Sequence, residues 1–353
     1  MIIKKYFLNN KSLSDEYYKN KSFYAIDLFK FLFSIAIIML HFPLSYVYAS
    51  KITKGIFIYF ARLAVPFFFI ASGYFLFKKL KYQDEIDKKK SIKKYLKKIA
   101  IMYIVWTIFN LPLLINTYND RSIIYNIKRC IFVGTYGQFW FLHALLLDIP
   151  IIFLLNKKVK PQIILIISSI LYLFGCIGFE FYKYVVNIPI LGSIYNFIFD
   201  NFITTRNFLF CGLYFVAIGN FFANNKFILK TRNTILIFII FSITMVLENF
   251  LFTKTSFEQS SDMRVSLIPL SFIVFYIIAH IELKERKVYY FLRNMSMLIY
   301  CSHRLCAELI FILFKISAIP DVKFYLGFLG SISLSFIVTW RKKKQKKLHV
   351  RQC

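Results

Sequence analysis

The sequence has few acidic residues and few cysteines. Its 353 residues include 17 Asp and Glu against 46 Lys and Arg, and the six cysteines show no Cys-x-x-Cys spacing. Because the cysteines fall mostly in apolar segments, we expect packing residues and not a disulfide or metal framework. The chain also lacks a Gly-rich phosphate loop and any His, Cys, Asp and Glu cluster at metal-ligand spacing. We therefore expect no nucleoside-triphosphate site and no metal.

Apolar residues, in contrast, are abundant. Hydrophobic residues make up 58% and aromatic residues 20% of the chain, which contains 43 Phe. Apolar stretches of about 20 residues follow one another along most of the sequence, more than a soluble domain of this size could bury. The sequence therefore predicts an all-α polytopic membrane protein. About ten transmembrane helices are expected, at residues 24–46, 56–77, 97–116, 138–155, 161–179, 207–222, 233–252, 265–281, 296–314 and 323–340.

Basic residues are distributed unevenly between alternate loops. Counted from the N-terminus, one set of loops carries 32 Lys and Arg and the other set carries 11. By the positive-inside rule, this imbalance indicates that both termini are cytoplasmic. The net charge of +29 then follows mostly from topology and from contact with anionic lipid headgroups, so nucleic-acid binding is not expected.

Three regions are expected along the chain. Residues 1–23 form a basic cytoplasmic leader, 24–340 a single transmembrane domain, and 341–353 a basic cytoplasmic tail. No small-residue cleavage site follows the first span, so the span is predicted to be retained and not to be a signal peptide. Between spans, residues 117–137 have helical character, and 186–204 are apolar enough for a re-entrant or interfacial segment.

The first predicted span carries polar residues along one face. Lys30 and His41 are eleven residues apart, so they differ by only about 20° around a helix axis. Asp27 and Ser34 fall on the same face, within an arc of roughly 60°. Ionisable side chains within a span are costly, so this stripe is a candidate functional site. Two structural alternatives remain open: Asp27 and Lys30 form an i, i+3 ion pair, and His41 satisfies a backbone carbonyl.

Five segments distributed over nearly the whole chain form a recognisable pattern. They are IDLFKFLFSIAIIMLH (26–41), RLAVPFFFIASGY (62–74), FWFL (139–142), TRN (205–207) with Gly212 and Gly219, and IYCSH (299–303). In this order the segments resemble the acyltransferase-3 family of integral membrane acyltransferases. The fourth segment is typical of the branch that contains the membrane domains of membrane-bound serine racemases.

The chain departs from the family pattern at several positions. Phe208 and Tyr214 replace an expected Gly and Pro, which puts the acceptor specificity in doubt. Lysines replace the family's Arg-x-x-Arg before the third span, at positions Lys93, Lys94, Lys97 and Lys98. A lysine still supplies charge for phosphate, but it loses the bidentate geometry of arginine.

The resemblance implies transfer of an acyl group, usually acetyl, from cytoplasmic acyl-CoA to a hydroxyl acceptor near the outer face of a bacterial plasma membrane. A cell-envelope glycan is the expected type of acceptor. We expect His41 to be the general base, because its imidazole titrates near neutral pH; transient acylation of His41 is the alternative. Lys30 and Asp27 are expected to set the local electrostatics or to hold the pantetheine arm of the donor.

Further residues are candidates for binding the two substrates. Lys94, Lys97 and Lys98 are expected to hold the CoA phosphates. His143 and His280 are interpreted as packing or interface residues. Membrane anchoring is the structural alternative for the arginines and for the tryptophan among the acceptor candidates. The acceptor candidates are Arg62, Trp140, Arg206, Asn207 and His303.

A second function remains open at this stage. Intramembrane charges would also suit a transporter or exporter of a sugar, amino acid or polysaccharide. Against it, the sequence shows no inverted repeat and no pair of Gly/Pro-broken helices in corresponding halves. The racemase or hydrolase domain that some family members carry is absent from the sequence, so racemisation is not expected.

Overall fold

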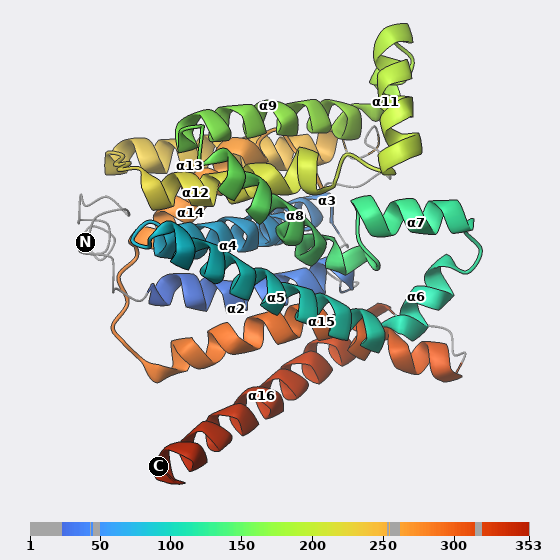
Figure 1. Cartoon of the computed structure of the whole chain (residues 1–353). Coiled ribbons are helices and arrows are strands. Elements are labelled where there is room, and N and C mark those ends of the chain that lie inside the picture. Colours follow the sequence, from blue (N-terminus) through green and yellow to red (C-terminus); the bar gives the residue numbers. More distant parts are fainter. Residues whose placement is uncertain are drawn as a thin grey trace. The chain divides into compact units, whose positions relative to one another are not determined.

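The computed structural model describes residues 23–42, 44, 50–252, 254, 262–314 and 320–352, and the regular elements among these residues are all helical (Figure 1). The all-α prediction is confirmed for this part of the chain. The predicted leader, apart from Phe23, lies outside the described residues. The chain divides into two compact units. Unit 1 contains Val65–Ile108 and Tyr118–Ile281, and unit 2 contains Phe23–Ala64, Phe109–Thr117 and the residues from Glu282 onward.

Unit 1 is a helix bundle with α12 in its interior. Nearly every residue of α12 is buried, and the helix packs against α8 and α9, while α13 packs against α14 (Figure 1). The helices are α4 (Ala64–Leu80), α5 (Glu85–Phe109), α7 (Ile123–Phe132), η3 (Gly137–Phe139), α8 (Trp140–Leu155), α9 (Pro161–Glu180), α10 (Tyr182–Val185), α11 (Pro189–Phe202), η4 (Phe208–Gly212), α12 (Leu213–Asn224), α13 (Thr231–Phe252) and α14 (Leu267–His280).

Glycines allow α4 and α12 to approach closely. A Cβ atom on Gly73 would lie 2.7 Å from the carbonyl oxygen of Val216, and one on Gly219 would overlap the backbone of Ile70 and Tyr74. Small residues at such crossings are typical of helix packing in membranes, where close backbone contact and not hydrophobic exclusion holds helices together.

Unit 2 is built around α15, which packs against both α2 and α16. Its apolar core includes Ile38 and Phe42 from the α2 region, and Ile299 and Ala307 from α15. The helices of unit 2 are α2 (Tyr24–His41), α3 (Lys51–Arg62), most of α6 (Leu111–Tyr118), α15 (Lys287–Phe314) and α16 (Pro320–Gln352).

The described helices support a multi-pass membrane protein but not the predicted count of ten spans. Seven helical stretches are long and apolar enough to cross a bilayer, or eight if α5 and α6 count as one span, and two of the seven, Tyr59–Leu80 and Ile123–Leu155, join successive helices. Two predicted spans correspond to shorter apolar helices, Phe208–Asn224 and Leu267–His280. The 14 residues of Leu267–His280 rise only about 21 Å, which is less than the roughly 30 Å of the hydrocarbon core.

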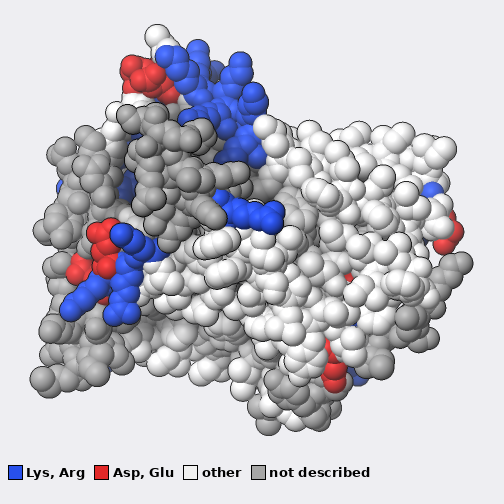
Figure 2. All heavy atoms as spheres, turned by 90° about the horizontal axis from the view of Figure 1, so that it is seen from below, with Lys and Arg blue, Asp and Glu red and all other residues white. Residues whose placement is uncertain are grey.

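The surface is suited to lipid over much of its area. The helix Thr231–Phe252 has a mean hydropathy of 2.4, yet only 11% of its apolar window is buried, so its side chains require an apolar solvent. On the face drawn in Figure 2, Lys and Arg gather in a few clusters and leave wide uncharged stretches between them.

Both segments that were expected between spans contain helices, although helical character was predicted only for 117–137. α7 lies within residues 117–137 and α11 within 186–204, and Lys128 Nζ of α7 donates to the carbonyl oxygen of Asp200 on α11 at 2.8 Å. These helices contain 10 and 14 residues. The prediction of helical character in 117–137 is therefore confirmed, whereas a re-entrant position for 186–204 stays a prediction.

Candidate active site

Two histidines from different helices stack in unit 2. His41 is the last residue of α2, and its ring stacks on that of His303 on α15. The ring centroids are 5.2 Å apart and the ring planes are inclined by 24°. His303 is fully buried, whereas His41 is exposed. Phe42 lies edge-on to the His303 ring at 6.4 Å. The sequence predicted separate roles for the two histidines, and the structure brings them together.

The hydrogen bonds of His303 determine which of its ring nitrogens carries the proton. Nδ1 lies 2.8 Å from the carbonyl oxygen of Tyr300 and 3.3 Å from that of Ile299. A carbonyl oxygen only accepts hydrogen bonds, so Nδ1 donates, and Nε2 of the neutral ring keeps its lone pair. Nε2 is buried and has no hydrogen-bond partner among the described residues. His303 thus presents an unused acceptor beside the exposed ring of His41.

An ion pair lies near the beginning of the same two helices. Asp27 is almost fully buried, and its Oδ2 lies 3.5 Å from Nη1 of Arg293 on α15. Lys30 also attracts Asp27 electrostatically. Asp27 and His41 are separated by about 21 Å along α2, so Asp27 does not contact the histidine pair. The partnership with Arg293 was missed by sequence reasoning, because the two residues are 266 positions apart.

Three of the predicted acceptor-binding residues lie at one end of unit 1. The Arg206 guanidinium lies 5.7 Å from the centre of the Trp140 ring and forms an ion pair with Asp262. Asn207 is buried, accepts from the Phe210 backbone N–H at 3.1 Å, and so caps η4. The structure therefore brings Trp140 and Arg206 together and assigns Asn207 a structural role, while its contact with an acceptor stays a prediction.

A second ionic cluster lies in unit 1, and one of its members, Arg264, follows Asp262 by two residues in the chain. Arg264 and Glu180 are fully buried, with Nη1 and Oε1 3.3 Å apart. Glu248 accepts from the Ser266 N–H at 3.2 Å and from the Ser266 hydroxyl. Burial lowers the pKa of the Arg264 guanidinium from its ordinary value, whereas Glu180 and Glu248 raise it. We call Glu180, Glu248 and Arg264 the ionic triad, of which Glu180 and Arg264 are fully buried; no sequence motif identified it.

The predicted CoA-binding lysines share one exposed face of α5. Lys94, Lys97 and Lys98 are exposed and stand at i, i+3 and i+4, where helical side chains are neighbours. The Tyr95 hydroxyl hydrogen-bonds the Ser72 side chain of α4, which holds this part of α5 against α4.

Arg62, another acceptor candidate, is the last residue of α3 and is half-buried. The helix α3 packs against α2, the helix that carries His41. Arg62 thus belongs to the same unit as the histidine pair. Its role toward an acceptor stays a prediction.

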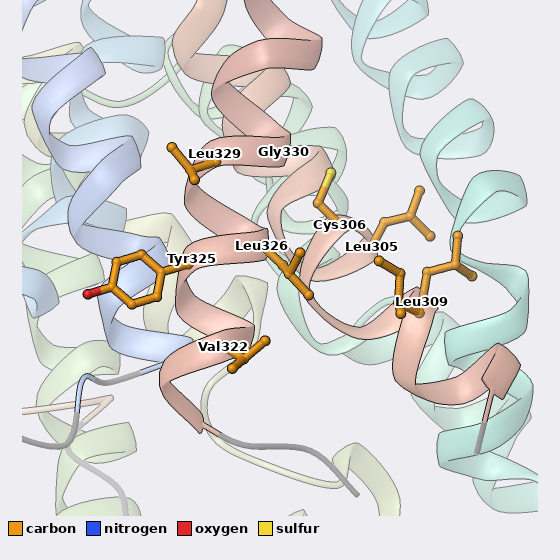
Figure 3. Close-up of a pocket in the computed structure, with 9 residues that line it drawn as sticks. Leu305, Cys306, Leu309, Val322, Tyr325, Leu326, Leu329 and Gly330 are labelled. Carbon is orange, nitrogen blue, oxygen red and sulfur yellow. The ribbon is translucent and has the colours of Figure 1, made fainter. Parts of the chain in front are cut away.

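An apolar groove of 560 Å³ lies between α15 and α16 in unit 2 (Figure 3). It begins two residues after His303 on α15. Its lining is almost wholly hydrocarbon, so it suits an alkyl chain and not a sugar or a nucleotide. The lining residues are Leu305, Cys306, Leu309, Ile310, Val322, Tyr325, Leu326, Leu329 and Gly330.

No group of three or more His, Cys, Asp or Glu that could hold a metal ion occurs within the described ranges.

Comparisons with known proteins identify the family. The acyltransferase-3 profile, described as "Acyltransferase domain", matches residues 23–340. Two proteins of Enterococcus faecalis named "Amino-acid racemase" are each 28% identical to this chain, over 91% and 89% of its length. A "Serine/alanine racemase" of Enterococcus gallinarum is 25% identical over 73% of the chain. These alignments span 45%, 45% and 37% of the relatives, so the chain matches less than half the length of these curated relatives.

No solved structure matches the chain. The racemase names agree with the predicted branch. The profile covers far more than half of the 353 residues, and the protein is therefore a member of the acyltransferase-3 family of membrane acyltransferases.

Proposed function

We propose that the protein is an O-acyltransferase of the bacterial plasma membrane. It transfers an acyl group, most simply acetyl, from cytoplasmic acyl-CoA to a hydroxyl group of a cell-envelope glycan or a similar acceptor. Family membership over residues 23–340 supports the reaction class. The observation that carries the assignment of a site is the stacked pair of His41 and His303.

In the proposed reaction, the exposed His41 imidazole takes the proton of the acceptor hydroxyl. The hydroxyl oxygen attacks the thioester carbonyl carbon, and the tetrahedral intermediate collapses with cleavage of the C–S bond. The CoA thiolate leaves and is protonated, so one ester and one thiol are formed. His303 supports this step because its ring stacks on His41 and its tautomer is held by the Tyr300 carbonyl.

The sidedness of the reaction follows from the proposed topology of ten spans with both termini cytoplasmic. In this arrangement α2 and α15 both run outward. Their ion pair of Asp27 and Arg293 then lies toward the cytoplasm, and their histidine pair lies toward the outer face. Within unit 1, the same proposed topology directs the end that carries Trp140, Arg206 and Asp262 outward, where an acceptor would arrive.

The function is tested by thiol release. Purified full-length protein in lipid nanodiscs, given acetyl-CoA labelled in the acetyl group and crude cell-wall polymers, is expected to release CoA thiol and to label the polymer. Omission of the polymer is the control, because transfer requires an acceptor. A transporter releases no thiol under these conditions. Absence of thiol release, together with uptake of labelled sugar or amino acid by vesicles that contain the protein, would establish transport instead.

The lysines of α5 provide a second prediction. Replacing Lys94, Lys97 and Lys98 together with Gln is expected to raise KM for acetyl-CoA about tenfold and to leave kcat nearly unchanged. The substitution removes phosphate attraction that is the same in ground and transition states. Steady-state kinetics of thiol release measure KM at low and at high salt. High salt should reduce the difference in KM between the triple variant and the wild type.

The matched control is Lys88→Gln on the same helix. Lys88 is paired with Glu85 at 2.7 Å, so its charge is already compensated and KM should change little. Equal KM values for the triple variant and the wild type would remove this part of α5 from the CoA site.

A further inference from the structure

A single carboxyl group is buried in the middle of α8. Asp148 is fully buried, and neither carboxylate oxygen has a hydrogen-bond partner among the described residues. It is the only acidic residue of α8, which contains no Lys or Arg, and about 12 Å of helix separate it from Trp140. The proposed reaction does not use this group.

The neighbours of Asp148 leave room for a carboxyl group but offer it no counter-charge. A Cβ atom on Gly212 of η4 would overlap Oδ2 of Asp148, so the carboxyl occupies the space that this glycine leaves open. The same Cβ would lie 3.1 Å from Ala144 and 3.3 Å from Phe69, which bound the space with hydrocarbon. The element η4 is a π-helix, a distortion that is frequent at functional sites.

The titratable groups on the surrounding elements are weak acids. On η4, the Cys211 thiol is in electrostatic contact with Asp148. On α12, the Tyr214 hydroxyl donates to the carbonyl oxygen of Ile268 at 2.9 Å. On α4, the adjoining side chain is Phe69. The Arg206 guanidinium also acts electrostatically on Cys211, but no basic side chain of the described residues forms an ion pair with Asp148, so the charged form has no direct counter-charge in an apolar interior.

We propose that Asp148 is a proton-binding site inside unit 1, and that its protonated form holds α8 against η4. The reaction is the reversible dissociation of the carboxylic acid, in which the O–H bond breaks and the proton passes to water that enters as the two elements separate. Loss of the proton leaves a carboxylate that is unfavourable in this space, and the packing of α8 on η4 weakens.

The site is placed to control residues of the proposed acceptor site. Trp140 begins α8, and Arg206 precedes η4 by two residues, so separation of the two elements alters the contact between the Trp140 ring and the guanidinium. Proton binding at Asp148 is independent of the proposed function. Only the effect on acceptor binding rests on the proposed function.

The first test is modification of the wild-type protein with dicyclohexylcarbodiimide. This apolar reagent adds to an undissociated carboxylic acid: the acid proton passes to a reagent nitrogen, the carboxyl oxygen bonds to the central carbon, and rearrangement yields a stable N-acylurea. Peptide mass spectrometry is expected to find the adduct on Asp148 at neutral pH and to lose it as the pH is raised and the carboxyl group loses its proton. Asp27, buried but paired with Arg293, is the matched control and should remain unmodified.

The second test does not depend on access of a reagent. The infrared difference spectrum between wild type and Asp148→Asn should contain the carbonyl stretch of an undissociated carboxylic acid at neutral pH, and the band should vanish at high pH. The difference spectrum between wild type and Asp27→Asn should lack it. Absence of the band at neutral pH overturns the proposal, whether or not Asp148 reacts with the carbodiimide.

The proposed coupling is measured through Trp140. In a Trp106→Phe, Trp340→Phe background, Trp140 is the only tryptophan of the three in the chain. Its emission should change over the pH range in which Asp148 loses its proton, and Asp148→Asn should remove this change. Emission that is independent of pH, or that changes equally in both proteins, overturns the coupling to η4.

Discussion

Replacing His41 with Ala is expected to lower the rate of acyl transfer by a factor of about 10² to 10⁴, with normal insertion and folding. The substitution removes the group that takes the acceptor proton. Because the side chain is exposed at the last residue of α2, little packing is lost with it. Single-turnover release of CoA thiol in nanodiscs measures the rate, and size-exclusion chromatography checks that the variant is folded.

His303 and His280 form a matched pair of controls for this prediction. The Nδ1 atom of His280 lies 2.7 Å from the carbonyl oxygen of Tyr276, so it makes the same kind of backbone contact as His303 without lying beside His41. His280→Gln should retain nearly full activity. His303→Gln preserves a donor to the Tyr300 carbonyl but loses the Nε2 lone pair, so its activity should fall. An undiminished rate in the His41→Ala variant contradicts the proposed mechanism.

Replacing Arg264 with Met is expected to destabilise the folded protein by about 3–5 kcal/mol. The substitution removes the guanidinium that attracts both carboxylates of the ionic triad. Glu180 is fully buried, so water cannot replace the lost partner. Thermal unfolding of the purified protein in detergent, followed by tryptophan fluorescence, should show a large decrease in the unfolding temperature.

Two further variants test this explanation. Arg206→Met removes an arginine whose ion pair with Asp262 is partly exposed, with side-chain exposures of 21% and 12%, so the loss of stability should be smaller. Adding Glu180→Gln to Arg264→Met removes one of the two carboxylates that Arg264 attracted and should recover part of the stability. Equal losses for Arg264→Met and Arg206→Met, with no recovery in the double variant, would show that the buried charges are not the cause.

The local sequence was sufficient to predict the helices and the family. Apolar runs predicted a helix at each expected span, because a chain in lipid must satisfy its backbone hydrogen bonds within each segment. The motif around His41 and the tripeptide Thr205–Asn207 indicated the family and its branch, which the profile match and the racemase names confirmed. The number of full-length spans could not be predicted in this way, because hydropathy alone does not determine the residues at which a helix such as α14 begins and ends.

The sequence by itself determined that the chain is helical, apolar and suited to a membrane, and that His41, Trp140 and Arg206 are candidates for chemistry. Only the tertiary structure decided which partners these residues have. His303 lies 262 positions from His41, and Arg293 lies 266 from Asp27, yet helix packing places each pair side by side. The isolation of Asp148 likewise depends on the neighbouring helices. Periodicity acts over a few turns of one helix, whereas ion pairs, ring stacking and burial depend on distances between helices that are remote in sequence.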